Sequence, residues 1–162
     1  MNIPLPRGTG DDGFALVRDA VILPQVQGFH PQAIVLQWGA DAVTEDPLAR
    51  LSLSNNSHWS VVRALMGMAP RLLVLGGGGY NPWSVARLWA GVWAALNGRS
   101  VPDVLPEAGQ VVMRGLSWHR KIRAMPTEAL LTTMQDRPRP GEISASVRDA
   151  VRYHQKRAQS WV

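Results

Sequence analysis

Two short apolar runs, at positions 33–37 and 71–75, constrain what this chain can fold into more than any other feature. Neither run alternates between apolar and polar residues, so both are predicted to be β-strands that are buried on both faces. A helical pattern lies between them, from about His58 to Met68, and another follows the second run, from about Trp83 to Leu96. This order of strand, helix, strand and helix predicts parallel strands joined by right-handed crossovers, and hence an α/β fold.

Further helices are expected on both sides of this unit. Asp11 or Asp12 can cap a helix that Pro24 should kink or end. A last helix is predicted over about 144–158, after a stretch in which prolines punctuate loops and short helices. At 162 residues the chain has the length of one domain, which we take to span 1–162.

The composition narrows the class of protein. Apolar residues make up 46% and charged residues 18% of the chain, which is typical of a globular domain. The absence of cysteine excludes disulfides and thiolate metal sites and suits the reducing cytoplasm, where we expect the protein. No stretch approaches the roughly 20 apolar residues that a membrane helix needs.

The net charge of +5 raises the question of a nucleic-acid partner. We favour a solvated basic surface, which could also attract acidic partners over a distance, because the basic residues are scattered and only two mild clusters occur. These clusters are Arg114, Arg120, Lys121 and Arg123, and Arg148, Arg152, Lys156 and Arg157.

Chemistry-bearing residues follow both predicted strands. Gly39-Ala40-Asp41 comes just after the first strand, and four glycines followed by Tyr80 come directly after the second. Because ligands of open α/β sheets bind beyond the carboxyl ends of the strands, Asp41 and Tyr80 should emerge at one edge if the strands are neighbours. A carboxylate and a phenol beside bare backbone indicate a metal site or an oxyanion site.

Taken separately, these residues leave other interpretations open. A glycine run after a strand can cradle phosphate, although the dinucleotide spacing fails here at Asn81, or it can be a structural tight turn. Asp41 alone can be a turn or cap residue. None of the four histidines has the i, i+4 spacing of a helical zinc pair, and none forms an Asp-x-His pattern.

The two motifs together resemble a known family. Gln37-Trp38-Gly39-Ala40-Asp41 followed by Leu75-Gly76-Gly77-Gly78-Gly79-Tyr80 is similar to the second half of the histone deacetylases and of their bacterial relatives, the acetoin utilization proteins. The segment Asn81-Pro82-Trp83 looks most like the bacterial branch. The resemblance is close over 1–105 and loose over 106–162.

This resemblance implies a parallel-sheet, three-layer, arginase/deacetylase-like fold and the hydrolysis of acetyl-lysine or a related acylated amine. It implies that Asp41 is one ligand of a catalytic Zn²⁺ and that the catalytic Tyr80 donates a hydrogen bond to the developing oxyanion. It also implies that Gly78 and Gly79 line a narrow acyl-lysine tunnel and that Leu48 lies at its rim.

Some parts of the family pattern are missing from this chain. It contains no His-His pair, which would transfer protons, and no Asp-x-His pair, which would supply the other zinc ligands. Because both should lie upstream, the resemblance implies an N-terminally truncated domain whose missing N-terminal half could be a partner. A catalytic zinc normally has three protein ligands, so this chain alone is expected to retain zinc poorly and to be inactive. In addition, Trp38 replaces a residue that is usually small and could crowd the site.

A second function remains open at this point. The chain could be a non-catalytic, degenerate binding module that keeps the shape of the deacetylase fold and binds a partner without turnover. Nucleic-acid binding through the basic residues from Arg148 to Arg157 is the interpretation that we favour least.

Overall fold

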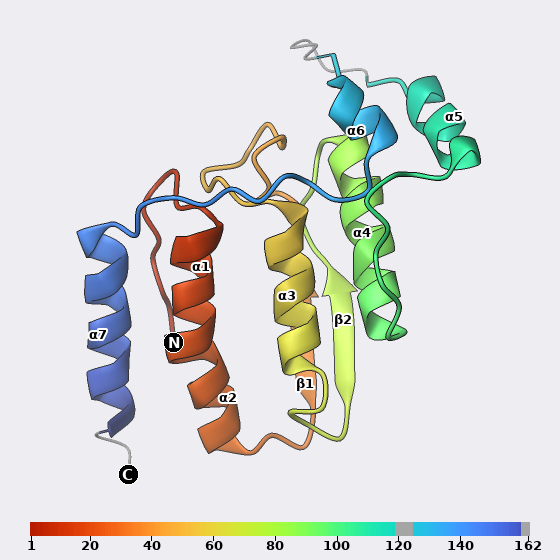
Figure 1. The fold of residues 1–162 in the computed structure, drawn as a ribbon. Coiled ribbons are helices and arrows are strands. Elements are labelled where there is room, and N and C mark those ends of the chain that lie inside the picture. Colours follow the sequence, from red (N-terminus) through yellow and green to blue (C-terminus); the bar gives the residue numbers. More distant parts are fainter. Residues whose placement is uncertain (119–124, 160–162) are drawn as a thin grey trace.

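The computed structural model describes residues 1–118 and 125–159. Figure 1 shows two strands with helices packed beside them, and a C-terminal helix that returns to the start of the chain. The elements in chain order are α1 (Asp11–Val17), the π-helical segment η1 (Arg18–Ile22), α2 (Leu23–Phe29), β1 (Ile34–Trp38), α3 (Asn55–Leu65), β2 (Leu72–Gly76), α4 (Pro82–Leu96), α5 (Glu107–Gly115), α6 (Glu128–Thr132) and α7 (Ala145–Gln159).

The two predicted strands are present and pair in parallel. Ile34 lies opposite Leu72, and Trp38 lies opposite Gly76. The connection between them contains α3, and α4 follows β2 directly, so the predicted strand–helix–strand–helix unit is confirmed (Figure 1). Both strands therefore end at the same edge of the sheet.

The prediction that both faces of the strands are buried is wrong. One face packs on α3 and α4 in the main core, which contains Trp59, Val62, Leu88 and Val92 together with Leu36, Trp38 and Val74 from the strands. On the other face Val35 is 63% exposed and Leu73 is 54% exposed. No element within residues 1–118 and 125–159 covers this face, although its apolar side chains are of the kind that a second layer normally covers.

The N-terminal helical run does not end at Pro24. The proline lacks the N–H that would bond to the Ala20 carbonyl, and the residues just before it are wound as the π-helical segment η1. The side-chain amide of Gln155 in α7 donates to that carbonyl at 3.3 Å. Helical geometry then continues through α2 to Phe29.

Helix α7 packs against the start of the chain. Val147 and Val151 form a second core with Val17 and Val21. Figure 1 shows α7 beside α1, with the connection from α6 crossing the molecule to reach it. Three of the four residues in the first basic cluster, Arg120, Lys121 and Arg123, lie outside the described residues.

Asp11 joins three segments that are distant in the sequence. Its carboxylate accepts hydrogen bonds from the amide and the hydroxyl of Ser54, both at 2.8 Å, from the Ser57 hydroxyl at 2.7 Å and from the Arg139 amide at 2.7 Å. Burial raises the pKa of Asp11, but these hydrogen bonds outweigh burial and bring the pKa below its ordinary value of 3.8. The carboxylate thus fixes α1 to the start of α3 and to the C-terminal segment.

The helix predicted from His58 begins earlier than the sequence suggested, at Asn55. Its first amides find acceptors from far along the chain, because the Asn55 amide donates to Asp136 at 2.9 Å while Ser54 bonds to Asp11. Asp136 also forms a buried ion pair with Arg87 of α4 at 2.7 Å. These contacts bring α3, α4 and the C-terminal segment together behind the sheet edge.

Candidate active site

The loops that follow β1 and β2 are in contact at the sheet edge. The Ala40 amide donates a hydrogen bond to the Gly78 carbonyl at 2.6 Å, which continues the strand pairing beyond the last paired residues. Asp41 and Tyr80 therefore follow two backbone segments that lie side by side, as their positions after parallel strands predict.

The glycines permit this close contact. A Cβ atom at Gly78 would lie 1.9 Å from Oδ2 of Asp41, and a Cβ atom at Gly39 would lie 2.7 Å from Oδ1. Gly79 has a φ of +145°, which favours glycine, and a Cβ there would lie 2.8 Å from Val85 and 2.9 Å from Ala40. The glycine run thus leaves space for the Asp41 carboxylate to lie against bare backbone.

The side chains at this edge are available to bind another group. Asp41 is half-buried, and its carboxylate accepts no hydrogen bond from any residue in the described ranges. Tyr80 is 46% exposed and Leu48 is 49% exposed. The residues predicted to bind substrate or metal are therefore partly open rather than built into the core.

Asp46 links two of these residues and was missed by the sequence analysis. Its Oδ2 accepts from the Tyr80 amide at 2.6 Å and from the Asn81 amide at 3.3 Å, and its Oδ1 accepts from the Leu48 amide at 2.9 Å. The contact of Asp46 with the Leu48 amide could have been predicted from the sequence, because an Asp side chain often accepts a hydrogen bond from the backbone amide two residues later. Nothing in the sequence indicated the contact with Tyr80.

His58 lies directly behind the loop that carries Asp41. Its Nε2 is 3.1 Å from the Gly39 carbonyl, and its Nδ1 is buried without a hydrogen-bond partner in the described part of the chain. Burial lowers the pKa of His58 below its ordinary value of 6.5, although the Gly39 carbonyl and the charges of Asp11 and Asp41 act in the opposite direction. The neutral ring donates to Gly39 from Nε2 and so supports the loop. The sequence had placed His58 only at a helix start.

Trp38 does not stand alone beside Asp41. Its ring packs 4.8 Å from the His58 ring and 6.3 Å from the Phe14 ring, between centroids. Its Nε1 donates to the His58 carbonyl at 3.3 Å. These contacts direct the indole towards α1 and α3.

The residues present do not form a metal site by themselves. Within 1–118 and 125–159, no group of three or more His, Asp or Glu side chains could hold a metal ion. A catalytic zinc takes three protein ligands, whereas Asp41 is the one that the described residues offer at this edge. The described side chains at this edge therefore cannot form a catalytic zinc site unless further ligands are added.

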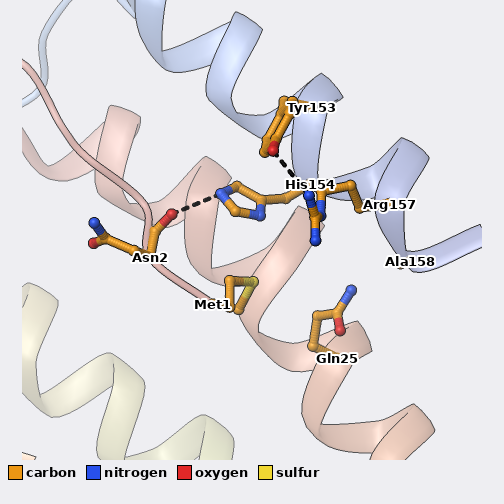
Figure 2. Close-up of a pocket in the computed structure, with 7 residues that line it drawn as sticks. All are labelled: Met1, Asn2, Gln25, Tyr153, His154, Arg157 and Ala158. Atoms are coloured by element: carbon orange, nitrogen blue, oxygen red, sulfur yellow. Dashed lines mark hydrogen bonds between the residues drawn. The ribbon is translucent and has the colours of Figure 1, made fainter. Parts of the chain in front are cut away.

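One pocket lies elsewhere in the molecule, between the N-terminus, α2 and α7. Figure 2 shows His154, whose Nε2 donates to the Asn2 carbonyl at 2.8 Å, and Arg157, which donates to the Tyr153 hydroxyl at 3.1 Å. None of the residues that line it belongs to the loops around Asp41 and Tyr80.

No helix among the described residues has both the length and the apolar character needed to cross a membrane.

The parallel strands, the helices that follow them and the glycine-lined edge define an α/β protein of the arginase/deacetylase fold. The chain belongs to the histone deacetylase family, since the family model of the histone deacetylase domain matches residues 1–96. The resemblance to the histone deacetylases stated from the two motifs is therefore confirmed.

Curated relatives agree with this assignment. The chain is 36% identical over 107 residues to histone deacetylase 19 of Arabidopsis thaliana, which covers 66% of this chain and 21% of that protein. It is 30% identical over 107 residues to histone deacetylase 8 of Xenopus laevis, which covers 66% of this chain and 33% of the relative. The chain thus spans a fifth to a third of the length of these relatives.

Solved structures show the same fold. A histone deacetylase homologue from Aquifex aeolicus superposes with a TM-score of 0.85 and 29% identity, over 96% of this chain and 42% of the homologue. The histone deacetylase Clr3 superposes with a TM-score of 0.71 over 100% of this chain and 22% of its own, and at 18% identity it supports the fold alone. An HDAC homologue has also been solved in complex with SAHA.

Proposed function

We propose that this chain is the part of a zinc-dependent deacetylase that carries the tyrosine and one metal ligand, and that it hydrolyses acetyl-lysine or a related acylated amine together with a complementary segment. The observation that carries the proposal is the meeting of Asp41 and the glycine run before Tyr80 at one sheet edge, in a chain of the histone deacetylase family. The acetoin utilization branch and a cytoplasmic location stay predictions.

Each residue at the edge has a role in this proposal. The Tyr80 hydroxyl would donate a hydrogen bond to the oxygen of the acyl carbonyl as negative charge develops on it. Gly78 and Gly79 would line the acyl-lysine tunnel, where a side chain has no room. The exposed side chain of Leu48 would lie at the tunnel rim.

A complementary segment is needed for two independent reasons. Asp41 offers one ligand, and the remaining zinc ligands and the proton-transferring histidines of the family must come from elsewhere. The uncovered sheet face, with Val35, Leu73 and Leu75 exposed, gives such a segment a surface to cover. These side chains are already about half-buried, so covering the part that remains exposed would contribute about 1–2 kcal/mol each to the association.

The experiment is a reconstitution. The 162-residue chain is co-expressed with the segment of the Aquifex aeolicus homologue that precedes the matched region, and acetate release from an acetyl-lysine peptide is measured with zinc present. Tyr80→Phe in the assembled complex should lower kcat by about 100- to 1000-fold, because one oxyanion donor is removed. Tyr153→Phe, which changes the chain's other tyrosine, is the matched control and should leave kcat unchanged.

Two results would count against the proposal. A Tyr80→Phe complex as fast as the unchanged complex would remove Tyr80 from the chemistry. An assembled complex that binds the peptide but releases no acetate would favour the alternative, a non-catalytic binding module of the deacetylase fold.

A further inference from the structure

A buried carboxylate connects the loop of Tyr80 to the loop of Leu48. Asp46 is only 5% exposed, and among the described residues it forms no ion pair with a basic side chain. In the part of the chain that the structure describes, its carboxylate accepts only from backbone amides, from Leu48 with one oxygen and from Tyr80 and Asn81 with the other. A buried charge without a cation is expensive, so these charge-assisted bonds are what stabilises the carboxylate there.

The same two loops are joined a second time around Asn81. Its side-chain amide donates to the Glu45 carbonyl at 2.9 Å, and its side-chain oxygen caps α4 by accepting from Trp83 at 3.1 Å. The Tyr80 backbone is thus held by the hydrogen bond from its own amide to Asp46 and, through the next residue, by the capped start of α4. The orientation of residue 80 is therefore set by the loop that also carries Leu48.

We propose that Asp46 is a positioning residue. Its carboxylate fixes the Tyr80 phenol and the Leu48 side chain relative to each other, so that both contact the same bound acyl chain, Leu48 at the tunnel rim and Tyr80 at the developing oxyanion. The inference rests on the proposed function. Asp46 does not touch the substrate; it acts through the backbone amides of the two residues that do. A small misplacement of a catalytic donor lowers the rate strongly, which makes such a support important.

Asp46→Asn provides the test, because it replaces one acceptor oxygen with a donor that must face an amide N–H. In the reconstituted complex it should lower kcat by about 10- to 100-fold, since the contact of Tyr80 strengthens only in the transition state, and it should also raise KM, since the rim contact of Leu48 is already made with the bound substrate. Glu45→Gln is the matched control, because the neighbouring carboxylate pairs with Arg139 instead of the Tyr80 loop. It should keep kcat within about threefold of the unchanged complex.

A double-mutant cycle separates positioning from mere structural support. If Asp46 acts through Tyr80, Asp46→Asn should cost less than about threefold in kcat when Tyr80→Phe is already present. Equal losses in both backgrounds would overturn the inference while leaving the proposed function intact. If the unchanged complex releases no acetate, the proposed function fails first, and the catalytic role of Asp46 fails with it.

A second measurement keeps the contact itself testable if Asp46→Asn folds poorly. Asp46→Glu keeps both the charge and the acceptors but moves them by one methylene. Hydrogen exchange at the Tyr80 and Leu48 amides should then quicken by about tenfold relative to the unchanged chain, while amides in α3 keep their protection. Unchanged exchange at both amides would show that the carboxylate does not hold these loops.

Discussion

Replacement of Asp11 by alanine should destabilise the folded chain more than its position in the first turn of a helix suggests. Asp11 accepts four hydrogen bonds, and its partners come from the start of α3 and from the C-terminal segment. Ser54 is fully buried and Ser57 is 7% exposed, so their donors have little access to water. Removing the carboxylate leaves these donors without an acceptor.

The size of the effect follows from these contacts. An unsatisfied buried donor costs about 1–3 kcal/mol, and because Asp11 is only half-buried, water can enter and hold each loss near the lower value. We therefore expect a loss of about 3–4 kcal/mol in the free energy of unfolding. Asp12→Ala is the matched control: Asp12 accepts one 3.2 Å bond from Gly141 at the surface, and its removal should cost about 1 kcal/mol or less.

The assay is urea unfolding of the 162-residue chain at pH 7, followed by the fluorescence of its seven tryptophans. The midpoint for Asp11→Ala should fall well below that for Asp12→Ala, with similar slopes. Hydrogen exchange should also quicken at Ser54 and at Arg139, which are 85 positions apart. Equal midpoints for the two variants would refute the reasoning that Asp11 joins these segments.

Two further predictions concern the site. Gly78→Ala places a Cβ where Oδ2 of Asp41 lies, so it should displace that carboxylate, lower the melting temperature and abolish acetate release by the reconstituted complex. Gly141→Ala, with open space around it, is the control and should have none of these effects. A fully active Gly78→Ala complex would contradict the packing. The folded chain keeps His58 neutral, with a pKa below 6.5, whereas His58 of the unfolded chain is protonated as the pH falls below 6.5. The free energy of unfolding should therefore be unaffected by this residue above pH 6.5 and should fall below it, by up to about 1.4 kcal/mol per pH unit. In His58→Gln the free energy of unfolding should change less between pH 7.5 and pH 5, and an unchanged dependence would mean that His58 is not held neutral.

Sequence patterns predicted the positions of Asp41 and Tyr80 because these residues follow secondary structure that is encoded locally. The apolar runs at 33–37 and 71–75 indicated β1 and β2, and the carboxyl ends of parallel neighbours must share an edge. The positions of Asp41 and Tyr80 beside that edge follow from this topology. The family motifs then predicted the fold, and this prediction requires no knowledge of side-chain contacts.

Only the tertiary structure decided what supports these residues. Asp46 contacts Tyr80 across 34 positions, and Asp11 reaches Arg139 across 128 positions, so no local pattern records either bond. The early start of α3 has the same cause, because distant carboxylates supply its acceptors. Likewise, an apolar run indicates that a strand prefers burial, but whether both of its faces are covered depends on which layers the rest of the fold brings against it. Among residues 1–118 and 125–159, only one face is covered.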